Sequence, residues 1–435
     1  MIDHVIRNAR LAGRPDPVDI GFAAGRIAAV GRSLACDAPA TDAGGCLCCA
    51  GMVESHIHLD KSRIIGRCAP EQGRAADAVR RISEVKHTFT VEDVYARAAT
   101  TLEGCIAHGT TRMRTHVEVD PKVGLRGFEA VRALAAAYRW AVDIEICVMP
   151  QEGLTNNPGT DELMVEAMRG GATVVGAAPS YDTDPAAQIR RVFAIAREFD
   201  ADLDLHLDFG NTPDGLDVPL VCELTAEHGL GGRVAIGHAT KLSTMPPAEQ
   251  ATMARRLGDA GVAVTVLPAT DLYLMGRDQT YNVRRGLVDA NLFIQHGCNC
   301  ALSSNNILNP FTPFGDGSMI RMANLQANVL QVGGPEGLAE CFAMLTDRPA
   351  RLMNLRDYGI AVGNPADMVI VDAETPAQAV TELREPLAVF KDGRQTVRRA
   401  RTELLRPAGR MTDGPADAGQ ASWPPCPRPL PGTIA

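Results

Sequence analysis

Between residues 50 and 360, short apolar runs alternate with longer amphipathic stretches. The apolar runs are rich in Val, Ile, Leu and Ala, which is typical of strands that are buried on both faces of a parallel sheet. We predict eight strands, at Leu47–His56, Thr110–Val117, Asp143–Met149, Thr173–Ala178, Ala201–His206, Val234–His238, Val262–Leu267 and Asn299–Ser303.

The stretches between these strands carry the spacing of amphipathic helices. We predict helices at Glu92–His108, Gly127–Ala141, Thr160–Gly170, Ala186–Phe199, Leu220–His228, Pro247–Ala260 and Asn282–His296. Eight strands that alternate with helices indicate an α/β fold of the (β/α)8, TIM-like barrel type. Such barrels place their active sites at the carboxyl ends of the strands.

The two ends of the chain have a different pattern. Within residues 1–49, two short strands flank Ala23-Ala24-Gly25, which is a hairpin signal. Residues 361–408 contain two further strand-and-turn patterns. We expect both ends to form one small β-sandwich-like domain beside a barrel that covers residues 50–360. The remaining residues, 409–435, are a Pro- and Gly-rich tail in which we expect no regular structure.

Histidines stand where several predicted strands end. His56 and His58 lie two positions apart, so on a strand they face the same side. His206 and His238 each end another apolar run. Because the strand ends of a barrel share one rim, these imidazoles can converge on one metal ion.

Composition narrows the possible partners and location. The net charge is −9, with 52 acidic and 43 basic residues, which argues against a nucleic-acid partner. No apolar run has the roughly 20 residues that a membrane span needs, and the first residues lack the apolar core of a signal peptide. The 12 cysteines do not have the paired spacing of a structural zinc site. We interpret them as buried thiols in a cytoplasmic protein; a redox or metal role for Cys46, Cys48 and Cys49 is the alternative.

Short motifs along nearly the whole chain resemble the amidohydrolase superfamily, and most of all its cytosine deaminase branch. They are Glu54–Asp60, Arg114–Val117, Pro150–Gly153, Asp204–Asp208, Gly237–Thr240, Gly276–Arg277, Arg284–Gly286, Asn309–Gly315 and Asn354–Ala361. The resemblance implies one divalent metal ion, zinc or iron, with His56, His58 and His206 as ligands. It also implies that His238 contacts the metal-bound water or the substrate, that Gln151 binds the amide edge of a heterocycle, and that the chain forms a homo-oligomer.

Two positions depart from the family pattern. The Asp that ends the eighth strand in the family falls on Asn305, and the Asp after it falls on Asn306. The Glu that moves protons, three residues after the strand-5 histidine, falls on Phe209. An amide cannot carry a proton between water and a leaving group. Positioned proton transfer contributes roughly 10² to 10⁴ in rate, so cytosine itself is a poor substrate candidate.

Other residues are candidates for the missing roles. Asp208 lies two residues beyond His206 and would share its face, so we predict a catalytic role for it beside His238 and Asn305. For substrate binding we predict Gln151, Asn306, Phe209 and Lys61, the last as a partner for a substrate carboxylate. Further acids at predicted strand ends are Asp60, Glu118, Glu152, Asp182 and Asp271. In an alternative interpretation, Asn305 and Asn306 only form a turn and have no role in the site.

The leading hypothesis is therefore a metal-dependent amidohydrolase. It would cleave a non-peptide C–N bond of a small N-heterocycle or cyclic amide with a metal-activated water. One alternative is a metal-poor binding protein that keeps the pocket. The other is a cyclase, isomerase or lyase that uses the same pocket without hydrolysis.

Overall fold

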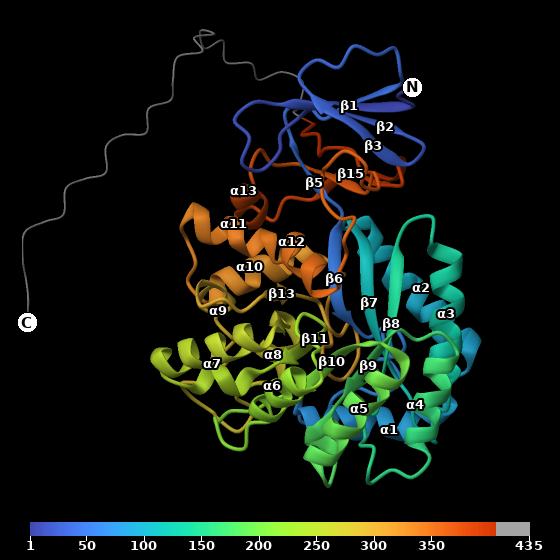
Figure 1. The fold of residues 1–435 in the computed structure, drawn as a ribbon, viewed down its shortest axis with the longest axis vertical. Coiled ribbons are helices and arrows are strands. Elements are labelled where there is room, and N and C mark those ends of the chain that lie inside the picture. The colour runs from blue at the N-terminus through green and yellow to red at the C-terminus, as the bar shows by residue number, and fades with distance from the viewer. Residues whose placement is uncertain (406–435) are drawn as a thin grey trace, which may run out of the picture. The chain divides into compact units, whose positions relative to one another are not determined.

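Eight parallel strands form the central sheet of the computed structural model, which describes residues 1–405 (Figure 1). Along the sheet each strand pairs with the next in the sequence, from β6 to β13. The strands are β6 (Met52–Ile57), β7 (Thr110–Glu118), β8 (Asp143–Met149), β9 (Val174–Ala177), β10 (Asp202–Leu207), β11 (Val234–His238), β12 (Val262–Val266) and β13 (Cys300–Leu302). With helices between successive strands, this arrangement confirms the predicted (β/α)8 barrel.

The barrel closes beside the predicted metal ligands. Ile57 at the end of β6 pairs in parallel with Asn305, just after β13. The backbone N–H of Asn305 donates to the carbonyl of His56 (3.0 Å), and the N–H of His58 donates to the carbonyl of Asn305 (2.8 Å). Asn305 is thus held between the two histidines of the first strand by its own backbone.

Helices connect and cover the strands. They are α1 (Ala75–Val85), α2 (Val91–Ala107), α3 (Arg126–Tyr138), α4 (Thr160–Arg169), α5 (Pro185–Phe199), α6 (Val218–Glu227), α7 (Pro247–Ala260), α8 (Pro268–Leu274), α9 (Ala290–Gln295), α10 (Met319–Val329), α11 (Pro335–Ala343), α12 (Asp347–Leu352) and α13 (Pro376–Thr381). None of the helices within residues 1–405 is both long enough and apolar enough to cross a membrane.

Local sequence explains where several helices start and stop. The side chain of Asp184 accepts a hydrogen bond from the N–H of Ala187 and so begins α5. Gly261, with φ of 70°, ends α7. The helix predicted over residues 282–296 is wrong in its first half. It begins only after Asp289, whose side chain caps the N–H of Leu292.

Two four-stranded sheets from the chain ends lie side by side (Figure 1). One holds β1 (His4–Ala9), β2 (Val18–Ala23), β3 (Arg26–Gly31) and β4 (Ala40–Asp42), and the other holds β5 (Leu47–Ala50), β14 (Met368–Val371), β15 (Pro386–Lys391) and β16 (Arg394–Arg398). Buried side chains of both sheets, including Ile20, Phe22, Met368 and Phe390, form one shared core. The expected β-sandwich from both chain ends is therefore present. The predicted tail, 409–435, lies outside the described residues.

The strand predicted over residues 47–56 is two strands. β5 belongs to the terminal sheet and β6 to the barrel, and only Gly51 separates them. A Cβ at Gly51 would lie 1.9 Å from Oγ1 of Thr111, so no larger residue fits at this crossing. The strand that leads to the two predicted metal ligands, His56 and His58, therefore continues directly from the terminal sheet.

Candidate metal centre and active site

Three imidazoles meet at the carboxyl ends of β6 and β10. His56 lies within β6, His58 follows its last residue, and His206 lies near the end of β10. The Nε2 atom of His206 is 3.1 Å from Nε2 of His56 and 3.0 Å from Nε2 of His58. Burial lowers the pKa of His56 to about 3 and lowers the pKa values of His58 and His206 well below their ordinary value. All three rings are therefore neutral at pH 7 and present lone pairs.

These nitrogens fit a divalent metal. Nε2 of His206 lies close to both other Nε2 atoms, and the Nδ1 atoms of His56, His58 and His206 have no hydrogen-bond partner. His238 also belongs to this cluster, because ring nitrogens of His56, His206 and His238 all lie within 4.8 Å of one another. Two imidazole nitrogens on a tetrahedral zinc ion lie about 3.3 Å apart, given Zn–N bonds of about 2.0–2.1 Å. The observed separations of 3.0 and 3.1 Å are close to that value.

Asp204 lies behind these histidines. Its Oδ1 atom is 3.4 Å from Nδ1 of His56 and 3.4 Å from Nε2 of His116, and Arg114 donates to its other oxygen. Burial opposes ionisation of Asp204, but His116 and His56 hold its pKa well below the usual range. A carboxylate in this place can orient the ring of His56.

His238, the last residue of β11, also lies next to His206. Its Nδ1 atom is 2.6 Å from Oδ1 of Asp271 in α8, and its Nε2 atom is 3.5 Å from Nδ2 of Asn305. The edge of the Phe209 ring packs against its imidazole, with ring centroids 5.4 Å apart. One side of His238 is therefore held by a carboxylate, and the other side is open to the cavity.

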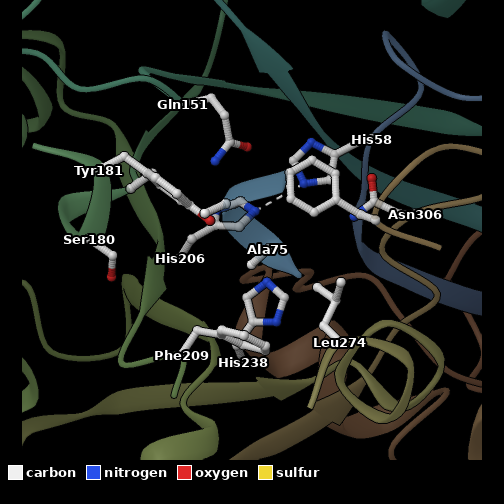
Figure 2. Close-up of a pocket in the computed structure, with 13 residues that line it drawn as sticks. His58, Ala75, Gln151, Ser180, Tyr181, His206, Phe209, His238, Leu274 and Asn306 are labelled. Atoms are coloured by element: carbon white, nitrogen blue, oxygen red, sulfur yellow. Dashed lines mark hydrogen bonds between the residues drawn. The ribbon is translucent and has the colours of Figure 1, made fainter. Parts of the chain in front are cut away.

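A cavity of about 230 Å³ opens above the imidazoles. Its lining residues are His58, Ala75, Ala76, Gln151, Ala178, Ser180, Tyr181, His206, Phe209, His238, Leu274, Asn306 and Phe311. Figure 2 shows Gln151, His58, His206 and His238 pointing their polar ends into the hollow. Burial raises the pKa of Tyr181 to about 12, so its hydroxyl stays neutral at pH 7. Apolar and aromatic walls around a few polar groups are typical of a site for a small, flat molecule.

Comparison with known proteins agrees with this geometry. The sequence profile of the amidohydrolase family matches residues 127–397. The chain belongs to the amidohydrolase family. It is 26% identical over 415 residues to the N-isopropylammelide isopropyl amidohydrolase of Pseudomonas sp. (strain ADP), covering 91% of this chain and 97% of that one.

Other relatives of this amidohydrolase act on other heterocycles. The pterin deaminase of Rhizobium rhizogenes is 25% identical over 347 residues, which are 78% of each chain. The structure of 5-methylcytosine deaminase from Klebsiella pneumoniae with 5-fluorocytosine is 28% identical. It superposes with a TM-score of 0.88 over 93% of this chain and 100% of that one.

The structure places the predicted substrate-binding residues of this amidohydrolase in two groups. Gln151, Asn306 and Phe209 line the cavity. Lys61 does not line it. Its Nζ atom lies behind Gln151, donates to Oε1 of that residue (2.9 Å) and is 3.7 Å from Glu118. This ammonium therefore holds Gln151 in place.

Two predicted catalytic residues also lie outside the cavity lining. Asp208 is buried in the loop after β10, and its carboxylate accepts hydrogen bonds from the backbone N–H groups of Asp217 and Val218 at the start of α6. Asn305 is fully buried next to the cavity residue Asn306, and its Oδ1 atom accepts from Nδ2 of Asn306. The structure gives Asp208 an evident role in anchoring this loop.

Sequence reasoning did not single out Asp204 or Glu54. The spacing held a signal for Asp204, because it lies two residues before His206 on one strand and so shares its face. Glu54 bears the same relation to His56. Burial raises the pKa of Glu54 to about 7 although Ser304, just after β13, donates two hydrogen bonds to it. Both carboxylates are buried within the barrel beneath the imidazoles.

Proposed function

We propose that this protein is a metal-dependent hydrolase of a C–N bond in a small N-heterocycle or cyclic amide. The observation that carries the proposal is that Nε2 of His206 lies 3.1 Å from Nε2 of His56 and 3.0 Å from Nε2 of His58, with His58 and His206 lining a small cavity. A divalent metal bound there supplies an activated water with a pKa of roughly 7.

The cavity residues are suited to bind a heterocycle. Because Lys61 donates to Oε1 of Gln151, the amide NH₂ of Gln151 is the group left for a ligand. It would donate to a carbonyl oxygen or an unprotonated ring nitrogen of the substrate. Phe209 and Phe311 supply apolar walls for a flat ring. The relatives named above act on ammelide derivatives, pterins and methylated cytosine, which all carry such acceptors beside an exocyclic nitrogen.

The proposal extends to the metal ion, the cellular location, the type of substrate and the oligomeric state of the protein. Three imidazoles suit zinc or iron, and we infer one such ion per chain. No disulfide joins the cysteines within residues 1–405, which supports a cytoplasmic location. The net charge of −9 supports a small-molecule substrate over a nucleic acid. A homo-oligomer rests on the family resemblance alone.

The test is a release assay on purified protein loaded with Zn²⁺ or Fe²⁺. Release of ammonia or alkylamine is measured from a panel of N-alkylammelides, pterins, methylated cytosines and cyclic amides. We expect turnover of at least one member, loss of turnover and of bound metal in His58→Ala, and no change in His87→Ala, because His87 is exposed outside the site. Ligand binding without release in both the wild type and His58→Ala would refute hydrolysis and favour a binding protein.

A further inference from the structure

Five side chains form one directed chain of hydrogen bonds, which we name the amide relay. Nδ2 of Asn309 donates to Oδ1 of Asn306 (2.7 Å), and Nδ2 of Asn306 donates to Oδ1 of Asn305 (2.8 Å). Nδ2 of Asn305 faces Nε2 of His238 (3.5 Å), and Nδ1 of His238 faces Oδ1 of Asp271 (2.6 Å). Three of these positions are amides, and the only carboxylate ends the relay.

The backbone fixes the direction of the relay at the Asn309 end. The N–H groups of Phe311 and Thr312 both donate to Oδ1 of Asn309, at 3.0 and 3.2 Å. The NH₂ group of Asn309 must therefore point the other way, toward Asn306 and the carbonyl of Lys61. Each amide then determines the orientation of the next, because an oxygen that accepts leaves the nitrogen to donate.

The carboxylate fixes the direction at the other end. Asp271 is fully buried, and its Oδ2 atom accepts from the backbone N–H of Leu267 (3.3 Å). Its Oδ1 atom is left to accept the proton on Nδ1 of His238. The hydrogen bonds at the two ends of the amide relay thus require the same tautomer of His238, with hydrogen on Nδ1 and a lone pair on Nε2.

We propose that Asp271 is a positioning residue that keeps Nε2 of His238 as the proton acceptor of the site, in place of the carboxylates absent at Phe209 and Asn305. This inference rests on the proposed function. As the C–N bond is attacked, Nε2 gives up its long contact with Nδ2 of Asn305 (3.5 Å) and takes a proton from the attacking water while that oxygen bonds to carbon. It then returns the proton to the leaving nitrogen as the C–N bond breaks, so the reaction consumes one water and leaves His238 unchanged.

Replacing Asp271 with Asn tests the tautomer directly. The N–H of Leu267 would keep the amide oxygen of the substituted side chain turned toward the backbone, so its NH₂ would face Nδ1 of His238 and donate to it. The proton of the imidazole would then move to Nε2. The side chain keeps its shape, so the change acts on hydrogen-bond direction and charge.

The experiment is NMR of zinc-loaded protein with ¹⁵N-labelled histidine, with the His238 signals assigned by comparison with His238→Gln. We expect a protonated Nδ1 and a bare Nε2 in the wild type, and the reverse in Asp271→Asn. Bound zinc should stay at the wild-type level in both variants. Turnover of whichever panel member the enzyme accepts should fall on the order of 10² to 10⁴ in kcat in Asp271→Asn, with little change in KM. Asp259→Asn, an exposed change in α7, is the matched control.

Two results would overturn the inference. A wild-type His238 with hydrogen on Nε2 would show that Asp271 does not set the tautomer, whether or not the variant folds. Loss of bound zinc in His238→Gln would show that His238 is a metal ligand and not the proton acceptor. Absence of turnover in the wild type would refute the proposed hydrolysis, while the NMR signals would still report the tautomer.

Discussion

Gly237→Ala should weaken metal binding although residue 237 is not a ligand. Gly237 lies in β11 beside His206, and a Cβ on it would lie 2.8 Å from Cε1 of His56. The His56 ring must then move by about 0.6 Å to reach ordinary contact distance. It has little room to move, because its centroid is only 3.8 Å from that of His116, at an interplanar angle of 31°.

The side chains of a functional site must be held within about 0.5 Å of their productive positions, and a displacement of this size exceeds that tolerance. Changes in residues that orient metal ligands cost about 10- to 100-fold in affinity. We therefore expect the dissociation constant for Zn²⁺ to rise by about 10- to 100-fold, which is about 1.4–2.7 kcal/mol. The added methyl group should also lower the stability of the metal-free protein by about 1–3 kcal/mol.

The assay is competition for Zn²⁺ with a chromogenic chelator at neutral pH, together with urea unfolding of the metal-free protein. Gly66→Ala is the control, because nothing lies within 4 Å of a Cβ at that exposed position. His116→Ala should open space behind His56, so the double variant should lose less affinity than the two single changes predict together. A dissociation constant within twofold of wild type for Gly237→Ala would refute the reasoning.

Three further predictions concern charged and polar groups. Lys86→Met leaves the buried carboxylate of Asp120 without its ammonium partner, so the free energy of unfolding in urea should fall by about 3–5 kcal/mol. The exposed Lys122→Met should cost less than about 1 kcal/mol, and equal losses would contradict the argument. For Asp182, burial opposes ionisation, but hydrogen bonds from Thr155 and nearby backbone N–H groups lower the pKa to about 2. The stability that this carboxylate adds is complete above its ordinary pKa of 3.8 and is lost as pH falls toward 2. Urea unfolding at pH about 5 and about 3 should therefore show a smaller loss for Asp182→Asn than for the wild type, and parallel losses would contradict this. The backbone of Asn305 bonds to His56 and His58, and its side chain reaches to 3.5 Å from Nε2 of His238. Asn305→Asp puts an anionic oxygen in this place, so the dissociation constant for Zn²⁺ should fall by about tenfold or more; an unchanged constant would show that this side chain does not reach the metal.

The sequence predicted the barrel well because its strands are strongly apolar and regularly spaced. Val234–His238 and Asp143–Met149 match the predicted strands to the residue. One error occurred where a tertiary contact decides the outcome. The predicted strand at 47–56 breaks at Gly51 because Thr111, distant in sequence, leaves no space there for a side chain. The second error has a local cause: the side chain of Asp289 caps the N–H of Leu292, so α9 begins after Asp289 and not at residue 282.

The candidate site was only partly readable for the first of these two reasons. Histidines at strand ends can be found from local patterns, and the structure brings His56, His58 and His206 together. The support for them comes from long-range pairs, such as His238 with Asp271, 33 residues apart. In the sequence, Asp271 was one of several acids at predicted strand ends. Only the folded structure shows that it contacts His238.

The continuity between the terminal sheet and the barrel has a consequence for biosynthesis. β5 leads through Gly51 into β6, and its partner in the terminal sheet, β14, begins only at Met368. A nascent chain that has reached residue 360 contains every histidine of the centre but lacks the strand that pairs with β5. Such distant pairing is slow to form and leaves a strand edge exposed until it does. We therefore expect the proposed metal centre to become stable only after β14 has been synthesised and has paired with β5.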